Sequence, residues 1–573
     1  MVLQGVAVCP GCLRAESYVL TDLPEFDLQA VSTLSPEETG AIIHEAMETI
    51  AGELEARRRS YEAEGNADMA DLQQVQAMML EDSTFLEGID SAVSEGAAAA
   101  AAVLRSGTAL EEMLLSLNDD YMSARAEDIR DLSTRVACRI EGVPYPSLAS
   151  LPGDRIVVAR QLLPSMLMGA DLPHIKGIVI GQGTKTSHVS ILASGLQIPT
   201  VVGCGDVSMI RPGEGIYLDG EKGSVHCSVT PEEAAACDAA IKVWEENQTR
   251  LARFADAPLR SADDVTAKLM VNITEPRELG ALGNCSIDGV GLFRSEFLFL
   301  DRQSLPSEEE QYQAYVSAVR QLGGKPLTIR TIDIGGDKQC DCLNLPKEEN
   351  PFMGFRAVRI CVERHDLILT QLRAILRAAA EGEIQVMFPM IATRWELTEM
   401  LDLLKQAAAQ LTEAGIPHRD SIKTGIMVEI PSAVVMLDQL MPLIDFVSIG
   451  SNDLVQYTYA ADRLNPKVSY LNQFMHPAAL RLISHTILQA EKYHTECSLC
   501  GEMAGDRIGF AALAILGLKK FSVSASKLLR TKSSLAMLNL AELAPLREKL
   551  LNAQSASDAV ALLRQALPAE YFA

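Results

Sequence analysis

From residue 257 onward, short apolar stretches alternate with helical ones, and this rhythm constrains the fold more than any other feature. We predict eight strands, at residues 268–273, 289–294, 327–333, 384–390, 425–430, 446–450, 497–500 and 520–523. Eight strand–helix units in one stretch of chain are typical of a (β/α)₈ TIM barrel, whose parallel strands close on themselves. The active site of such a barrel lies at the carboxyl ends of its strands.

Five of the predicted strand ends carry charged or reactive side chains: Arg294, Arg330, Glu429, the pair Asn452 and Asp453, and Cys500. A charge within an apolar run is costly unless it is paired. Ion pairs between neighbouring strands could account for one or two of these groups. Five together favour a binding site.

The arginines indicate the kind of ligand. Arg294 and Arg330 can each bind carboxylate or phosphate oxygens through two parallel N–H donors, a geometry that lysine cannot reproduce. Arg463 lies in the loop region beyond residues 450–453 and could add a third guanidinium. A solvated surface arginine is an equally good interpretation of that position from the local sequence.

The carboxylates and the thiol complete the predicted site. Glu429 and Asp453 offer hard oxygen ligands on adjacent strands, which suit Mg²⁺ together with phosphate oxygens. Cys500 ends a strand, where its thiol could donate or accept a proton, although simple burial is an even alternative. Together these groups predict a site for a small phosphorylated carboxylic acid held on magnesium.

A second candidate centre is His188. An apolar run at 177–180 predicts a buried strand, and a Gly-rich turn leads from it to Thr186 and Ser187, which are placed to cap a helix ending at Gly195. Unpaired N–H groups and the positive dipole end make a helix N-terminus favourable for anions. We therefore interpret His188 as a carrier of a phosphoryl group; a histidine satisfied by its own turn is the alternative.

The N-terminal half shows a change of pattern. Strand signals occur at 1–20 and again from 155 to 228, whereas residues from about 31 to 143 have helical spacing, including an alanine run at 97–102. We expect a multidomain α/β protein. Its predicted parts are an α/β domain (1–20 and 144–228), an all-helical insert (21–143), a linker helix (229–256) and the barrel (257–573).

Composition excludes several classes of protein. A net charge of −26 disfavours nucleic acid and anionic membranes as partners and suits a basic protein partner. No apolar run is long enough to span a membrane, and the N-terminus has no basic leader, so we expect a cytoplasmic protein. Twelve scattered cysteines are too sparse for a disulfide scaffold. Zinc joining the distant Cys9/Cys12 and Cys497/Cys500 pairs is disfavoured.

Several long motifs occur in order along the chain: MLED at 79–82, RAEDIRD at 125–131, GVGLFRSEFLF at 289–299, RTIDIGGDK at 330–338, EENPF at 348–352, MVEIP at 427–431, SIGSNDL at 448–454 and CGE at 500–502. With these motifs the chain resembles, over its full length, the phosphoenolpyruvate–protein phosphotransferases, enzyme I of the sugar phosphotransferase system. Pyruvate phosphate dikinase and phosphoenolpyruvate synthase share the phosphohistidine domain and the barrel. They need an ATP-binding domain for which this chain has no room.

The resemblance implies roles for the candidate residues. His188 would take the phosphoryl group from phosphoenolpyruvate and pass it to the phosphocarrier protein HPr, and Cys500 would protonate the enolate to give pyruvate. Phosphoenolpyruvate would be bound by Arg294, Arg330, Asn452, Asp453 and Arg463, and Mg²⁺ by Glu429 and Asp453. The helical insert would dock HPr, the barrel would form a homodimer, and the α/β domain would swivel about the linker helix.

The chain departs from the family pattern around His188. Thr184 stands where glycine is usual, Lys185 where arginine is usual, and Ser194 where a second arginine is usual. Gln76 also replaces a histidine that many members carry in the docking helix, and Cys9 replaces a serine. These differences leave open a weakly active or inactive paralogue that acts as a regulator or scaffold.

Overall fold

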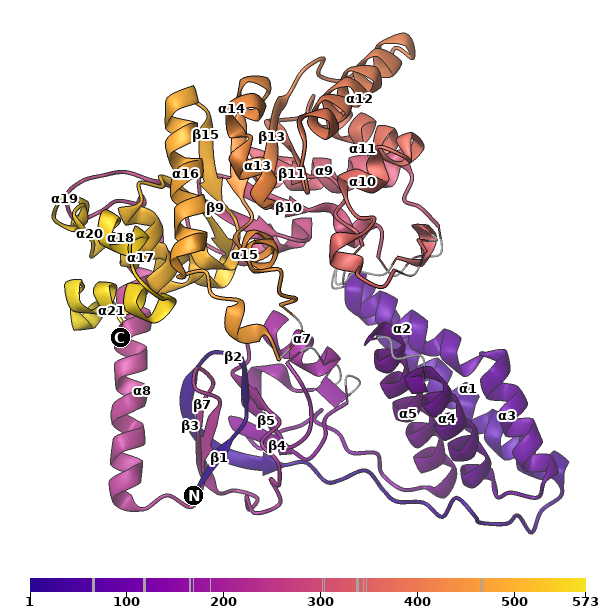
Figure 1. The fold of residues 1–573 in the computed structure, drawn as a ribbon. Coiled ribbons are helices and arrows are strands. Elements are labelled where there is room, and N and C mark those ends of the chain that lie inside the picture. The colour runs from indigo at the N-terminus through magenta and orange to yellow at the C-terminus, as the bar shows by residue number, and fades with distance from the viewer. Residues whose placement is uncertain are drawn as a thin grey trace. The chain divides into compact units, whose positions relative to one another are not determined.

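The computed structural model describes residues 1–573 except 64–66, 117–119, 164–165, 168–169, 186, 301, 303, 336–339, 344, 347, 464, 466 and 573. The chain divides into two compact units, Met1–Asn247 and Gln248–Ala573 (Figure 1). Helix α8 (Pro231–Ala252) spans the boundary between them, within the segment predicted as a linker helix. No helix in the described part of the chain is long and apolar enough to cross a membrane.

The C-terminal unit contains the predicted barrel. Its strands are β9 (Lys268–Ile273), β10 (Val290–Arg294), β11 (Leu327–Arg330), β12 (Ile384–Phe388), β13 (Lys423–Val428), β14 (Phe446–Ile449), β15 (Glu496–Leu499) and β16 (Lys520–Ser524). Each strand pairs in parallel with the next, and β16 pairs with β9, which closes the barrel. The prediction of a (β/α)₈ barrel is confirmed.

Helices connect these strands, and strand and helix side chains share one core. The described helices of this unit are α9 (Glu308–Gln321), α10 (Val358–Cys361), α11 (His365–Ala378), α12 (Arg394–Glu413), α13 (Pro431–Val435), α14 (Leu437–Leu440), α15 (Ser451–Tyr459), α16 (Pro477–Tyr493), α17 (Arg507–Ile515), α18 (Leu528–Ala536), α19 (Leu540–Leu543), α20 (Leu546–Leu551) and α21 (Ala556–Ala566). Capping boxes start α9 and α12, at Ser307 and Thr393, so local sequence fixes where these helices begin.

Several strands end earlier than predicted, and this corrects the placement of two candidate residues, Glu429 and Asp453. Strand β11 ends at Arg330, so Asp333 lies in the following loop. Glu429 comes directly after β13, and Asp453 lies in the first turn of α15, so these carboxylates do not sit on adjacent strands. The apolar run continues past the last ladder hydrogen bond because the chain stays buried there while it leaves the barrel wall.

The N-terminal unit contains an eight-stranded sheet with the strand order β1-β8-β7-β3-β4-β5-β6-β2. The strands are β1 (Val2–Gln4), β2 (Val6–Cys9), β3 (Cys12–Val19), β4 (Arg155–Ala159), β5 (Ile175–Ile180), β6 (Thr200–Val202), β7 (Gly215–Asp219) and β8 (Ser224–His226). Strands β3 to β6 run parallel, so their carboxyl ends share one edge. Segments far apart in sequence, before and after the helices, thus form one sheet.

The helical segment of this unit comprises α1 (Pro36–Ala63), α2 (Ala67–Leu80), α3 (Ser83–Ser94), α4 (Ala99–Ser116) and α5 (Asp120–Glu141), drawn in indigo to purple in Figure 1. These helices pack around their own core. The alanine run joins α4 only from Ala99. Ala97 instead forms an isolated bridge with Val31, and Ala98 N–H donates to Ala30 O at 2.8 Å, so these two backbones are used in pairing with the preceding segment.

Candidate active site

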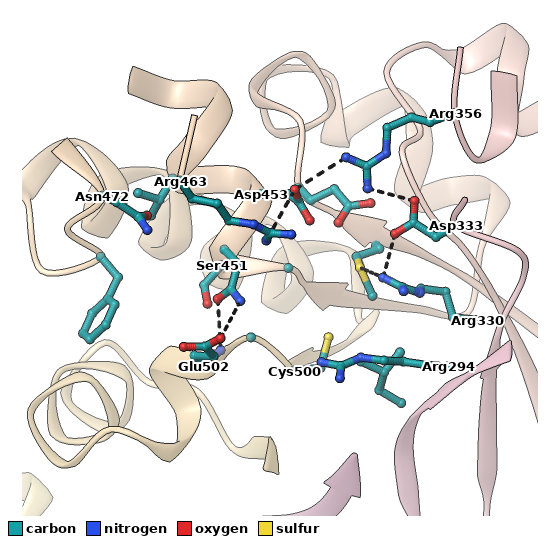
Figure 2. A pocket seen from close by; sticks show the side chains of 18 residues that line it. Arg294, Arg330, Asp333, Arg356, Ser451, Asp453, Arg463, Asn472, Cys500 and Glu502 are labelled. Carbon is teal, nitrogen blue, oxygen red and sulfur yellow. Dashed lines mark hydrogen bonds and ion pairs between the residues drawn. The ribbon is translucent and has the colours of Figure 1, made fainter. Parts of the chain in front are cut away.

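A cavity of about 580 Å³ opens at the carboxyl ends of the barrel strands. Its lining includes every residue that the sequence placed in the barrel site, which are Arg294, Arg330, Glu429, Asn452, Asp453, Arg463 and Cys500. These side chains come from four different strand ends and from the segment after β14, and they converge on one space (Figure 2). Arg463, whose sequence allowed a surface position, lies in the pocket as well.

Arg330 is the most firmly held cation of the pocket. It is 6% exposed, its Nη2 donates to Glu296 Oε1 at 2.8 Å, and its Nη1 lies 2.9 Å from Asp333 Oδ2. Burial by itself lowers the pKa of Arg330, but the carboxylates of Glu296 and Asp333 outweigh it and raise that pKa above its ordinary value. Arg330 is therefore a fixed positive charge whose fork is oriented by two buried acids.

Arg356 and Asp333 also line the pocket, and sequence reasoning did not single them out. Arg356 Nη2 donates to Asp333 Oδ1 at 2.9 Å, and Arg356 Nη1 lies 3.7 Å from Asp453 Oδ1. Asp333 thus bridges Arg330 and Arg356 (Figure 2). Asp333 follows Arg330 by three residues within the RTIDIGGDK motif, and this position could have identified it as a site residue from the sequence. Arg356 follows no strand, and only the folded loop brings it here.

The loop that brings Arg356 into the pocket depends on Gly335. Gly335 has φ +107°, a left-handed conformation that favours glycine. A β-carbon there would lie 2.4 Å from Arg356 Cβ. The close approach lets Ala357 N–H donate to Ile334 O at 3.0 Å, which holds the two ends of the loop together.

Glu429 and Asp453 bring two carboxylates into the same cavity. Glu429 is fully buried, and its Oε1 accepts a hydrogen bond from Met390 N–H at 2.7 Å. Burial, together with the nearby charges of Asp453 and Asp333, raises the pKa of Glu429 above its ordinary value. Glu429 Oε2 and Asp453 Oδ1 are buried and accept no hydrogen bond from the described residues.

This donor set fits a magnesium ion. Hard carboxylate oxygens without hydrogen-bond donors, in a pocket that also carries phosphate-binding guanidinium groups, are the ligands that Mg²⁺ prefers. A bound cation would also offset the like charges of Asp453 and Asp333, which add to burial in raising the pKa of Glu429. Among the described residues no ready-made cluster of three or more His, Cys, Asp or Glu ligands exists, so water and substrate oxygens would have to complete the coordination.

The other polar residues face the opening of the cavity. Arg294 ends β10 and is exposed to it. Asn452 Nδ2 lies 3.3 Å from Glu502 Oε1, and Glu502 N–H donates to Asn452 Oδ1 at 3.1 Å, which fixes the amide. Arg463 Nη1 lies 3.8 Å from Asp453 Oδ1, and its guanidinium stacks over Phe352 at 5.7 Å from the ring centroid. Arg294 and Arg463 thus both present guanidinium groups to the cavity.

Cys500 lies at the floor of the cavity, 3% exposed, beside Leu292 and Met427. Burial raises the pKa of its thiol, and the charges of Arg330 and Arg294 oppose this only in part. The thiol Sγ donates to Ile449 O at 3.8 Å. Its backbone is fixed on both sides, because Cys500 N–H donates to Ile449 O and Asn272 Nδ2 donates to Cys500 O at 2.9 Å. The residue is both buried and part of the pocket, so it is a positioned, protonated thiol.

The helix predicted around His188 is present. Strand β5 leads to it, and α7 (His188–Gly195) begins at His188 with Ser187 as its N-cap. Ser190 Oγ donates to Thr184 O at 2.7 Å, and Thr184 does not take a positive φ, so a β-carbon at 184 is tolerated without strain. The predicted cap Thr186 and the side chain of His188 lie outside what the structure describes.

Comparison with known proteins gives a consistent result along the whole chain. The sequence matches the families "PEP-utilising enzyme, PEP-binding domain" at residues 248–540, "PEP-utilising enzyme, mobile domain" at 151–223 and "PEP-utilising enzyme, N-terminal" at 4–125. The phosphoenolpyruvate-protein phosphotransferase of Priestia megaterium is 36% identical over 564 residues, 98% of each chain. Its namesakes from Listeria innocua (36%) and Bacillus subtilis (35%) match over 98% of this chain and 99% of their own.

Proposed function

The chain belongs to the family of phosphoenolpyruvate-protein phosphotransferases, and from this premise we propose the reaction that it catalyses. It transfers the phosphoryl group of phosphoenolpyruvate to His188, releases pyruvate, and passes the group on to a histidine of an HPr-like phosphocarrier protein. The observation that carries the proposal is the barrel cavity, in which seven residues expected for phosphoenolpyruvate, magnesium and proton transfer line one space. The alternative of an inactive paralogue is not favoured, since none of these groups is missing.

The guanidinium groups of the pocket bind the substrate anion. Arg330 and Arg294 approach from neighbouring strand ends β11 and β10, and Arg463 comes from the segment after α15. Phosphoenolpyruvate carries both a carboxylate and a phosphate, so three cations in one cavity match its charge. Because Glu296 and Asp333 hold Arg330 in place, its donors are oriented before substrate arrives, which reduces the cost of ordering them.

Glu429 and Asp453 would hold Mg²⁺, which when bound spreads the charge of the phosphoryl group during transfer. Cys500 would supply the proton. When the P–O bond to the enol oxygen breaks, the departing enolate takes the Cys500 S–H proton at its methylene carbon and becomes pyruvate. A raised pKa keeps Cys500 protonated near neutral pH, so the proton is available when the enolate forms.

His188 would receive phosphorus on a ring nitrogen, forming an N–P bond as the P–O bond breaks. Its backbone starts α7, whose unpaired N–H groups and dipole disfavour imidazolium and stabilise the phosphorylated product. His188 and the cavity belong to different compact units, and His188 has to serve both the cavity and the carrier, so the part that carries His188 would swivel, with a hinge at α8 on the boundary between the units. Lys185 and Ser194, both exposed, would alter the rate and the choice of carrier rather than the chemistry.

The remaining roles are also proposals. The helical segment would dock the carrier, and the barrel unit would form a homodimer. Free thiols at all twelve cysteines are consistent with action in the cytoplasm.

Labelling with radioactive phosphoenolpyruvate and Mg²⁺ tests the function. We expect an acid-labile phosphoryl group on the wild type and none on His188→Ala. His174→Ala is the matched control, because His174 belongs to the same unit but pairs with Asp171, and it should label normally. Transfer of the label to added HPr proteins would identify the partner. Absence of label on the wild type would contradict the proposal.

A further inference from the structure

Two cysteines lie side by side in the loop that follows β11. Cys340 Sγ and Cys342 Sγ are 3.0 Å apart, closer than ordinary van der Waals contact between sulfur atoms. A disulfide bond is about 2.0 Å long, so the two sulfurs need to approach by only ~1 Å to be bonded. Both cysteines are free thiols.

Both thiols also contact the same backbone carbonyl oxygen, that of Phe299. Cys340 Sγ donates to Phe299 O at 3.1 Å, and Cys342 Sγ lies 3.5 Å from the same oxygen. Phe299 ends the short 3-10 helix Ser295–Leu298, which follows β10 and carries Glu296. The reduced thiols therefore attach the β11 loop to the segment whose Glu296 orients Arg330.

The loop itself reaches the pocket at its other end. It carries Asp333, which pairs with Arg330 at 2.9 Å and with Arg356 at 2.9 Å. Thus Arg330 is held by one acid from each of the two segments that the thiols join, Glu296 from one and Asp333 from the other. A change in the thiols has a short physical route to the substrate-binding arginine.

The two thiols differ in accessibility. Cys340 is 8% exposed, and burial and the neighbouring Cys342 thiol raise its pKa to about 12. Cys342 is only half-buried. A small reagent would therefore meet Cys342 first, and Cys340 would act as the second, internal thiol.

We propose that Cys340 and Cys342 form a redox site, which a low-molecular-weight disulfide converts to an intramolecular disulfide and which thereby weakens binding in the adjacent pocket. Two soft sulfurs without a third Cys or His ligand among the described residues fit this oxidation better than a soft metal ion. None of the residues proposed for phosphoryl transfer takes part in the modification.

The exchange balances in two steps. The Cys342 thiolate attacks one sulfur of the small disulfide, which forms a mixed disulfide and releases one small thiolate. Cys340 then gives its proton to that thiolate, and its sulfur attacks Cys342 Sγ, which expels the second small thiolate; this thiolate takes up the proton that the Cys342 thiol had released. The two protein thiols are oxidised to one disulfide, and the small disulfide is reduced to two thiols.

Oxidation removes both S–H donors from Phe299 O. The thiol contacts between the loop and the Glu296 segment are lost, while the hydrogen bond from Asp333 N–H to Glu296 Oε1 at 3.2 Å remains, so the two acids hold Arg330 less firmly. We expect the affinity for phosphoenolpyruvate to fall roughly three- to tenfold, the range for losing one or two weak hydrogen bonds. This part of the inference rests on the proposed function.

The modification is tested by treating the full chain with oxidised glutathione and digesting it with trypsin. Residues 339–347 form one tryptic peptide with Cys340 and Cys342 as its only cysteines. We expect this peptide to lose two hydrogens and to recover them with dithiothreitol. A peptide that stays reduced, or that keeps glutathione on Cys342 beside a free Cys340, would overturn the proposal.

The effect on the pocket is tested by calorimetry with phosphoenolpyruvate, using reduced and oxidised protein and the Cys342→Ser variant under both conditions. Cys342→Ser should bind as the reduced wild type does, and glutathione should not change its affinity. If it weakens equally, oxidation elsewhere, such as at Cys500, is responsible and the inference is wrong. Unchanged affinity of the fully oxidised wild type would also refute the coupling. If the reduced protein binds no phosphoenolpyruvate, the proposed function fails, while the peptide assay still decides whether the disulfide forms.

Discussion

Replacing Arg330 with alanine is the sharpest perturbation of the pocket. The guanidinium bridges Glu296 at 2.8 Å and Asp333 at 2.9 Å, and it is 6% exposed. Arg330→Ala removes a donor fork to the substrate and leaves two buried acids without their common cation. Asp333 keeps Arg356 as a partner, so the loss falls mainly on Glu296 and on the ligand.

The magnitude follows from the burial of the charge. Truncating one partner of a buried, hydrogen-bonded charge pair costs at least ~2 kcal/mol, which corresponds to about a thirtyfold rise in the Kd for phosphoenolpyruvate. Arg330→Lys keeps the positive charge but has no fork to reach both acids and the ligand, so we expect an intermediate loss. Breaking the buried pairs also lowers the stability of the barrel unit, by about 3–5 kcal/mol for the alanine variant.

Calorimetry with phosphoenolpyruvate and Mg²⁺ measures the affinity, and thermal unfolding of each variant verifies that it is folded at the assay temperature. Arg320→Ala is the matched control, because Arg320 pairs with Glu381 at 3.1 Å on the surface with 65% of its side chain exposed. Its loss should change affinity and stability by no more than about 0.5 kcal/mol. If folded Arg330→Ala and Arg330→Lys both bind phosphoenolpyruvate as tightly as the wild type, Arg330 does not bind the substrate.

Three further outcomes are expected. Cys500→Ala should slow pyruvate formation in a rapid-quench assay while leaving phosphoenolpyruvate affinity nearly intact, because the thiol supplies a proton rather than a binding charge; unchanged turnover would assign Cys500 to structure alone. Magnesium affinity should fall as the pH is lowered from neutrality, because burial raises the pKa of Glu429 and protons then compete with the cation. Glu429→Gln should abolish both the magnesium affinity and its pH dependence. Gly335→Ala should destabilise the barrel unit by roughly 1–3 kcal/mol in urea unfolding, since its β-carbon would lie 2.4 Å from Arg356 Cβ at φ +107°. Gly280→Ala is the control, because a β-carbon at Gly280 would have nothing within 4 Å. Equal destabilisation by the two substitutions would contradict the argument.

Much of the barrel could be predicted from the sequence. Each strand carries its own apolar run, and each boundary between elements carries its own turn or cap. The period of these runs identified all eight strands, and β9 (Lys268–Ile273) has the predicted bounds. Ser187 and Gly195, at the two ends of α7, were also set by local chemistry. Strand ends were less well predicted at β11, because burial of an apolar residue does not reveal whether its backbone is still paired.

What the sequence by itself determined is therefore the kind of elements, their order, and the chemical groups placed at their ends. Hydrophobic period, caps and residue type are local properties, and they were sufficient for the barrel and for the seven candidate residues that line its cavity. Only the tertiary structure brought Arg356 beside Asp333, moved Asp453 from a strand end into the first turn of α15, and set Cys340 and Cys342 against Phe299 O. These contacts join segments whose separation in the chain carries no signal, because their geometry exists only after the loops have folded.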